Sequence, residues 1–236
     1  DVAACREKHI TVCNVPDYCG DEVADHSMAL ALALARQVTV IERRLQGGTW
    51  KLQSATPMPA FRDMLFATAG YGRIARAVLA RAKGFKFKLG AYDPFVKPEV
   101  LRKDGVEPLD LDGLFAKADI LSLHTPLTPE TRHLVNAQSL ARMKPTAIVV
   151  NTSRGPLVDT VALAAALDRG VIGYAGIDVY EKEPLPADHP LRKCRNALLT
   201  SHVAWYSEAS GAVLQRLAAE EAARCLKGET PKNRVN

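Results

Sequence analysis

The chain alternates short apolar runs with helix-like segments, and this alternation restricts the fold more than any other feature of the sequence. Continuous apolar runs are typical of strands that are covered on both faces. With helices between them, the runs predict an α/β fold built on a doubly wound parallel sheet, a Rossmann-type domain. The runs are MLFATA (64–69), FKLGAYD (87–93), ADILSLHT (118–125), AIVVNTS (147–153), GYAGIDVY (173–180) and NALLTSH (196–202).

Helical segments are predicted between these strands and towards both ends of the chain. The segment 21–37 is apolar nearly all round, so we expect it to be buried between layers. The segment 47–61 is rich in Gly and Pro, which predicts a connector. The other helical predictions are GRIARAVLARAKG (72–84), LDGLFAKA (111–118), TPETRHLVNAQSLARM (128–143), TVALAAALDRG (160–170) and an amphipathic helix over 207–228.

Composition excludes several classes of function. The net charge of +5 comes without a long basic run, so we expect a mildly basic enzyme and no nucleic-acid partner. No run of apolar residues is long enough to cross a bilayer, and the first ten residues do not resemble a secretory signal. The five cysteines contain no C-x-x-C pair, which favours free thiols in the cytoplasm and no metal site.

A dinucleotide-binding pattern follows the first predicted strand. Gly70, Gly72 and Ala75 are spaced as G-x-G-x-x-A and open a helix. The first glycine permits a tight turn, the second lets the backbone approach a pyrophosphate, and the small third residue lets helix and strand pack closely. Asp93 ends the second strand at the place where an acid binds a ribose. Because a carboxylate repels a 2′-phosphate, the pattern predicts NAD rather than NADP.

Distinctive polar residues follow the later strands too. In a doubly wound sheet, ligands bind beyond the carboxyl ends of the strands. We therefore expect one binding edge formed by these residues. They are His124, Thr125 and Pro126 after the third strand, Thr152, Ser153 and Arg154 after the fourth, Asp178 and Glu183 after the fifth, and His202 with Trp205 after the sixth.

Arg154, Glu183 and His202 are the candidate catalytic residues. A guanidinium matches a carboxylate bidentately, and an imidazole exchanges protons near neutral pH. A carboxylate beside the imidazole orients the ring and favours its protonated form. Together these groups suit a small 2-hydroxy or 2-oxo acid. Each residue also has a structural alternative: Arg154 could pair with Asp159 or cap a helix, Glu183 could lie in a solvated turn, and His202 could be a core histidine.

The remaining histidines have simpler interpretations. His124 is expected to stand beside the cofactor without performing chemistry. The others are expected to be structural: His9, His26, His133 and His189.

Several blocks together resemble the D-isomer-specific 2-hydroxyacid dehydrogenases. They cover nearly the whole chain in family order, and VNTSRGPLVD with IDVYEKEPL is the most specific combination. The ending HVAWYSEAS looks most like the branch that contains the C-terminal-binding-protein corepressors. The blocks are NVPDYCGDEVADHSMALALALAR, GYGRIARAV, YDP, LHTPLTPETRHLVN, MKPTAIVVNTSRGPLVD, GYAGIDVYEKEPL and SHVAWYSEAS.

The resemblance implies a role for each matching residue. Arg154 would bind the substrate carboxylate, and His202, paired with Glu183, would give or take the proton. Asp178 would hold the nicotinamide carboxamide, and Trp205 would lie beside His202 and wall the substrate pocket. The cofactor would be lined by Gly72, Arg73, Ile74, the stretch Thr125 to Thr131, and Thr152 to Arg154.

The resemblance also implies a domain organisation. Residues 1–21 would be the end of a substrate domain, 22–206 the NAD-binding domain, and 207–236 a helix that returns to the substrate domain. Most of that substrate domain is not in the sequence, so we expect a fragment, and we expect a homodimer through the cofactor domain. The alternative from another class is an NAD(H)-sensing module that docks protein partners, as corepressor relatives do.

Overall fold

The structure is a computed structural model that describes residues 1–50 and 57–236. It divides into two compact units. One unit is Val23–Ala204, and the other joins Asp1–Glu22 to Trp205–Asn236. Each unit is described separately below. Assignment of the smaller unit to a substrate domain stays a prediction.

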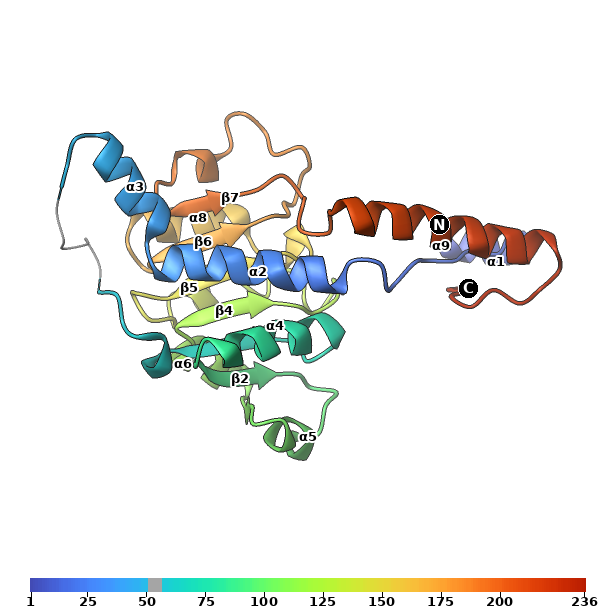
Figure 1. Ribbon diagram of the computed structural model, residues 1–236, viewed down its shortest axis with the longest axis horizontal. Helices are drawn as coiled ribbons and strands as arrows, with labels where there is room; N and C mark the ends of the chain where they lie inside the picture. Colours follow the sequence, from blue (N-terminus) through green and yellow to red (C-terminus); the bar gives the residue numbers. More distant parts are fainter. Residues whose placement is uncertain (51–56) are drawn as a thin grey trace. The chain divides into compact units, whose positions relative to one another are not determined.

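The unit Val23–Ala204 is built on one parallel sheet. Within the described residues the sheet has seven strands in the order β3-β2-β1-β4-β5-β6-β7, so the connections run outward in both directions from β1 and β4. All adjacent strands are parallel, and their arrowheads point to one edge in Figure 1. The strands are β1 (Leu65–Ala69), β2 (Lys88–Tyr92), β3 (Glu107–Pro108), β4 (Ile120–Leu123), β5 (Ile148–Asn151), β6 (Tyr174–Ile177) and β7 (Ala197–Leu199).

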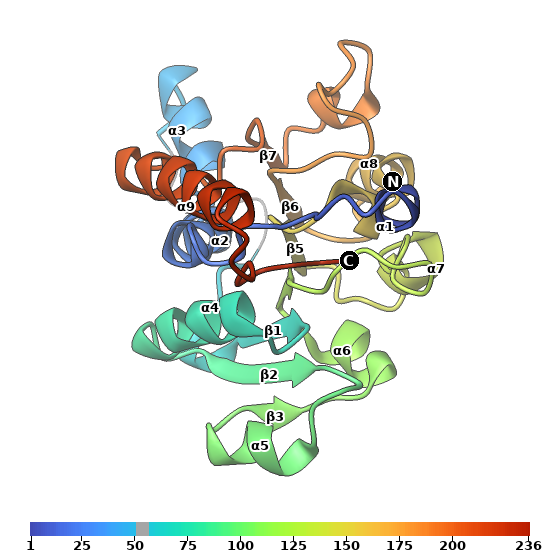
Figure 2. The ribbon, with the colours of Figure 1, turned by 90° about the vertical axis from the view of Figure 1, so that its right-hand side faces the viewer.

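Helices cover both faces of this sheet, as the apolar runs require. Figure 2 shows α2 (Gly20–Ala35) and α4 (Arg73–Gly84) on one face and α6 (Leu111–Lys117) and α8 (Thr160–Asp168) on the other. Side chains alternate between the two faces along each strand. In β1, Leu65 packs in the core beneath α6 and α8, whereas Phe66 packs in the core beneath α2 and α4.

The last residues of six strands pair with one another. Their register places them side by side, so the loops that follow all emerge from one edge of the sheet. The residues are Tyr92, Ala69, Leu123, Asn151, Ile177 and Leu199. The predicted doubly wound α/β fold is therefore present, with the predicted binding edge formed by these loops.

The sequence prediction was wrong over residues 128–143. Only α7 (Ala137–Leu140) is helical there, and the residues before it form turns. His133 adopts a left-handed φ of 52°, and Val135 makes an isolated parallel bridge to Val158. Asn136 then caps α7. The segment leaves the helical path because its backbone bonds to a distant part of the chain.

The remaining elements of this unit are short, and the sequence did not predict them. They are α3 (Val38–Gln46), α5 (Pro98–Lys103) and the 3-10 turns η1 (Phe61–Asp63), η2 (Gly155–Leu157) and η3 (Pro190–Lys193). Part of the predicted connector 47–61 lies outside the described residues.

The smaller unit contains α1 (Val2–Glu7) and α9 (Glu208–Leu226). Ser207 and Ser210 form a capping box that starts α9, close to the predicted boundary at 207. Cys13 makes an antiparallel bridge with Arg234, which brings the two ends of the chain together. Across residues 1–50 and 57–236, none of the helices is both long and apolar enough to span a membrane.

Candidate active site

The glycine turn after β1 has a backbone that only glycine can adopt. Gly70 has φ +96°, and a Cβ atom on it would lie 2.7 Å from the carbonyl oxygen of His124. Thr68, which is polar in an otherwise apolar strand, is buried and donates to the Gly70 carbonyl at 2.8 Å. The turn is thus fixed by close approach to the loop after β4 and by an internal hydrogen bond.

The start of α4 fits the pyrophosphate of a dinucleotide. Gly72 is the N-cap, and a Cβ atom placed on it would meet no heavy atom within 4 Å. That space lies against the first turn of α4, where backbone N–H groups and the helix dipole favour an anion. Arg73 is exposed at this position, and Ile74 is half-buried and packs against the core.

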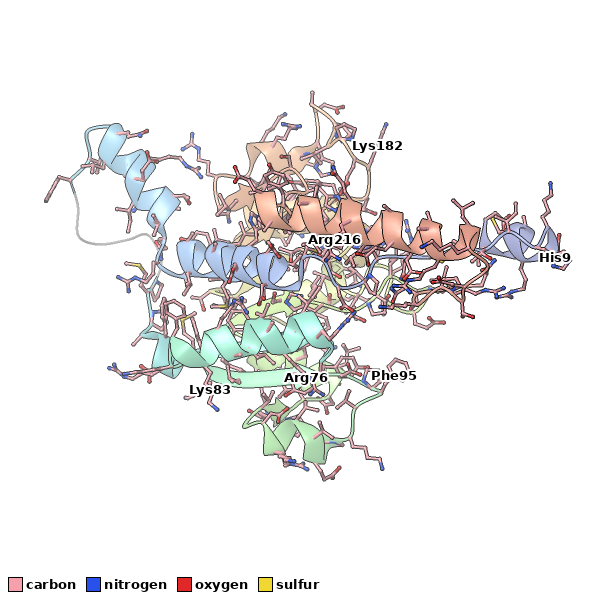
Figure 3. The ribbon with its side chains drawn as sticks, turned by 45° about the vertical axis from the view of Figure 1, so that its right-hand side comes forward. His9, Arg76, Lys83, Phe95, Lys182 and Arg216 are labelled. Carbon is pink, nitrogen blue, oxygen red and sulfur yellow. The ribbon has the colours of Figure 1, made fainter. Side chains whose placement is uncertain are left out.

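Asp93 holds the glycine turn from the end of β2. Its carboxylate accepts hydrogen bonds from Tyr71 N at 2.8 Å and Phe95 N at 2.9 Å. Phe95 is 94% exposed, and Figure 3 shows it with Arg76 at this edge of the sheet. The Arg76 guanidinium lies 4.5 Å from the centre of the Tyr71 ring. The predicted ribose-binding acid therefore also fixes the turn that it faces.

His124 follows β4 and is electrically neutral at pH 7. Its Nε2 atom is 2.8 Å from Ser122 Oγ, which lies in the sheet. Burial lowers the pKa of His124 from 6.5 to about 4, because a charged ring would lose its hydration there. A neutral ring supports the prediction that His124 stands at the site without transferring protons.

The loop after His124 is held by hydrogen bonds between its own residues and to the next loop. Thr131 Oγ1 donates to the carbonyl of Pro126 at 2.7 Å. Ser153 Oγ donates to the carbonyl of Thr125 at 3.0 Å. The predicted cofactor-lining residues of two loops are thereby joined. Thr152 is held from another side, since its hydroxyl lies 2.7 Å from that of Ser27 on α2.

Arg154 lies on a turn that Asn151 organises. The buried Asn151 amide donates to the Arg154 carbonyl at 2.9 Å and accepts from Ser153 N at 3.1 Å. The Arg154 side chain is exposed and donates to the Ser153 carbonyl at 2.7 Å. Asp159, the alternative partner, instead caps α8 by accepting from Ala162 N. In the part of the chain that the structure describes, no carboxylate forms an ion pair with Arg154.

The residue after Arg154 contacts the loop that carries Glu183. A Cβ atom on Gly155 would lie 1.9 Å from the carbonyl oxygen of Tyr180 and 2.6 Å from Glu181 N. Such distances exclude any side chain at position 155 without backbone movement. The loops after β5 and β6 therefore pack directly against each other through their backbones.

Glu183 and His202 form a hydrogen-bonded pair. His202 Nδ1 is 2.6 Å from Glu183 Oε2, and Glu183 Oε1 accepts from Tyr180 N at 2.9 Å. Partial burial opposes ionisation of Glu183, but the bonds from His202 and Tyr180 N outweigh it and hold the pKa of Glu183 below its ordinary value. The carboxylate therefore stays ionised beside the imidazole.

A cavity of about 800 Å³ borders this pair. Apolar side chains form much of its wall, and they include Leu185, Leu199 and Val203. The imidazole of His202 thus meets a largely apolar space on one side.

Asp178 is completely buried and holds the turn that carries His202. Its carboxylate accepts from Thr200 Oγ1 at 2.5 Å, Val203 N at 3.0 Å and Ala204 N at 2.9 Å. Its own carbonyl accepts from His202 N at 2.8 Å. His202 has a left-handed φ of 57°, and these bonds hold it there. The predicted contact between Asp178 and a nicotinamide stays a prediction.

Trp205 belongs to the smaller unit, where its ring packs edge-on against Tyr18 with centroids 6.1 Å apart. Its carbonyl accepts from Ser210 Oγ at the start of α9. Its predicted place beside His202 stays a prediction. Across the described residues, no cluster of three or more His, Cys, Asp or Glu side chains could hold a metal ion.

Sequence reasoning missed several residues that build this site. Asn151 and Thr200 position the predicted residues through side-chain hydrogen bonds, and Tyr180 donates its hydroxyl to the carbonyls of Ile177 and Thr200. The signal available was position, because each lies at or just beyond the end of a strand. Two histidines were expected to be structural. His133 bonds to Glu181, and His26 bonds to Thr200.

The fold and the site define a dinucleotide-binding α/β domain with a glycine turn after β1 and an imidazole–carboxylate pair in the loops after β6 and β7, at the same edge of the sheet. A family model described as D-isomer specific 2-hydroxyacid dehydrogenase, NAD binding domain, matches residues 28–204. The chain belongs to this family. It is an oxidoreductase of the NAD-dependent D-2-hydroxyacid dehydrogenase class, and NAD is its cofactor.

Similar proteins agree with this assignment. The chain is 40% identical to a glyoxylate reductase of Korarchaeum cryptofilum and spans 72% of its length. It is 38% identical to a D-3-phosphoglycerate dehydrogenase of Methanocaldococcus jannaschii and spans 45% of that protein. All of this chain superimposes on 76% of a D-lactate dehydrogenase from Aquifex aeolicus, solved with NAD and lactic acid, with a TM-score of 0.91 and 29% identity. The corepressor branch stays a prediction.

Proposed function

We propose that the chain carries the NAD-binding and proton-transferring parts of an enzyme that interconverts a small D-2-hydroxy acid and its 2-oxo acid. The observation that carries the proposal is the 2.6 Å contact between His202 Nδ1 and Glu183 Oε2. This pair follows strands whose ends are in register with the strand before the glycine turn. Relatives named glyoxylate reductase and D-3-phosphoglycerate dehydrogenase support a small acid as substrate.

His202 is the proposed proton donor for reduction. Its Nδ1 bonds to Glu183, and Nε2 is the nitrogen that would give a proton to the carbonyl oxygen of a 2-oxo acid. The ionised Glu183 keeps the ring in one orientation through this bond. In the reverse direction the neutral ring accepts the hydroxyl proton. Bound NADH supplies the hydride that the substrate carbon receives.

Arg154 is the proposed binding residue for the substrate carboxylate. It is exposed and donates to the carbonyl of Ser153, so its guanidinium has further N–H groups for a ligand. A planar guanidinium binds a carboxylate through two parallel hydrogen bonds, which fixes the substrate relative to His202. Since the hydride and the proton go to adjacent atoms, that orientation decides whether transfer occurs.

The experiment supplies the full-length protein that contains this chain with NADH and a panel of 2-oxo acids, and it follows the loss of NADH absorbance. Glyoxylate, hydroxypyruvate, pyruvate and a phosphorylated 2-oxo acid form the panel. We expect at least one to be reduced, and His202→Asn to lower kcat by on the order of a hundredfold or more. Arg154→Lys should raise KM for the acid, because Lys cannot bind a carboxylate bidentately.

Arg216→Gln is the matched control, since Arg216 is an exposed arginine on α9 that pairs with Glu220. It should leave both kinetic constants unchanged. Full activity in His202→Asn would exclude the proposed role of the imidazole. An NADH-dependent change in the binding of a protein partner, without turnover of any acid, would instead favour the sensing module. The relatives named as enzymes do not support that alternative. The homodimer and the cytoplasmic location remain predictions from the sequence.

A further inference from the structure

The loop after β6 carries two glutamates that bond to two different imidazoles. Glu183 bonds to His202, and Glu181 Oε1 lies 2.6 Å from His133 Nε2. Lys182 stands between the glutamates and is exposed at the outer side of the loop (Figure 3). The two carboxylates therefore engage different parts of the chain, and only one of them belongs to the proposed catalytic pair.

Glu181 is anchored at the start of α8. Its Oε2 atom accepts from Thr160 Oγ1 at 2.7 Å and from Thr160 N at 3.1 Å. Thr160 is the first residue of α8, where the helix dipole favours a negative charge, and it is almost completely buried. Partial burial opposes ionisation, but the bonds from Thr160 and His133 outweigh it and hold the pKa of Glu181 below its ordinary value.

His133 is fixed independently of Glu181. Its backbone N donates to the carbonyl of Pro156 at 2.8 Å, and its own carbonyl accepts from Asn136 Nδ2 at 2.9 Å. The bond to Pro156 ties it to η2, which begins directly after Arg154. The imidazole that meets Glu181 therefore comes from a segment whose position is already set by the Arg154 turn.

Glu183, in contrast, depends on its loop for its position. Its side chain is 36% exposed, and its carboxylate bonds to Tyr180 N and to the exposed ring of His202. The distance between that carboxylate and His202 is therefore set by where the backbone of Tyr180 and Glu181 lies. Gly155 packs against this backbone from one side, and the bonds of Glu181 hold it from another.

We propose that Glu181 and His133 are positioning residues that set the carboxylate of Glu183 against His202. This inference rests on the proposed function, because it assigns them to the acid–base pair. They act through the backbone of the loop and need not touch the substrate. Loss of the Glu181 anchor lets residues 181–183 move, so Glu183 loses its short contact and the imidazole loses its fixed orientation.

The test compares Glu181→Gln with Lys182→Gln, a charge removal at the exposed neighbouring residue. In Glu181→Gln we expect kcat for 2-oxo acid reduction to fall on the order of tenfold to a hundredfold, with the Kd for NADH unchanged. Lys182→Gln should leave both constants unchanged. Equal kcat values in Glu181→Gln and in the unsubstituted protein would overturn the inference.

A second measurement does not require turnover. The chemical shift of the Glu183 carboxyl carbon is measured by NMR as a function of pH. In the unsubstituted chain it should titrate below 4.5, and in Glu181→Gln its midpoint should move upward, because the bonds that favour the carboxylate are loosened. An unmoved midpoint contradicts the inference. A shifted midpoint in a chain that reduces no acid supports the positioning role and rejects the proposed function.

Thr160→Val provides a milder variant in case Glu181→Gln does not fold. It keeps the shape of the side chain and the backbone N–H but removes the hydroxyl that donates to Glu181. A smaller change in the same direction, in both kcat and the Glu183 midpoint, supports the inference. A fall in kcat without any change in that midpoint contradicts it.

Discussion

His202 and Asp178 are joined through two kinds of hydrogen bond: the backbone N of His202 donates to the Asp178 carbonyl, and the Asp178 carboxylate accepts from the two residues after His202. The backbone position of His202, just beyond the end of β7, is therefore determined by a buried aspartate. Glu183 then fixes the orientation of the ring. Position and orientation are thus set by different residues of one loop.

Asp178→Asn should destabilise the chain and displace His202. An amide at this position presents an NH₂ group towards donors such as Thr200 Oγ1 and Val203 N, so at least one buried group loses its partner. We expect the free energy of unfolding in urea to fall by about 1–3 kcal/mol. Asp112→Asn, at an exposed carboxylate, is the control and should change it little. An unchanged free energy in Asp178→Asn would contradict this account of the turn.

Gly155→Ala should disrupt the contact between the loops after β5 and β6. A methyl group would lie 1.9 Å from the Tyr180 carbonyl oxygen, so the backbone has to move. We expect a loss of about 1–3 kcal/mol or more in the free energy of unfolding. Gly84→Ala, at the last residue of α4 with open space around it, should not destabilise the chain. Equal free energies of unfolding for the two variants would contradict a packing role for Gly155.

The pH dependence of stability should contain a contribution from His124. Its pKa is about 4 in the folded chain and 6.5 when solvated, so between these values the unfolded chain binds the extra proton. The free energy of unfolding therefore falls as the pH drops from 6.5 to 4. His124→Asn should make that fall less steep in urea denaturation. An imidazole of His124 that titrates near 6.5 by NMR would contradict the prediction.

Asp93→Asn should weaken the discrimination between NADH and NADPH. The amide can still accept from Tyr71 N, so the turn should persist, but the charge that repels a 2′-phosphate is gone. We expect the Kd for NADPH to fall relative to that for NADH, measured by nucleotide fluorescence. Asp119→Asn changes a carboxylate that bonds to Leu65 N at the start of β1 and should not alter the ratio. If the ratio of the two Kd values were unchanged in Asp93→Asn, the charge of Asp93 would not be the cause of the discrimination between NADH and NADPH.

The local parts of the fold could be read from the sequence. Apolar runs predicted six strands, and the glycine spacing predicted the turn at Gly70, because both depend on residues that are neighbours in the chain. Family resemblance pointed to Glu183 and His202, which the structure places in contact. The helix predicted over 128–143 was wrong, since propensity there is overridden by bonds to residues 156–158.

The sequence by itself determined the doubly wound sheet, the glycine turn and the set of polar residues that follow the strands. Only the tertiary structure decided that Asp178 holds the His202 turn, that Gly155 touches the backbone of Tyr180, and that Glu181 bonds to His133. Apolar periodicity and turn chemistry act over a few residues. These contacts join residues far apart in the chain, and their distances exist only once the sheet has aligned the strand ends.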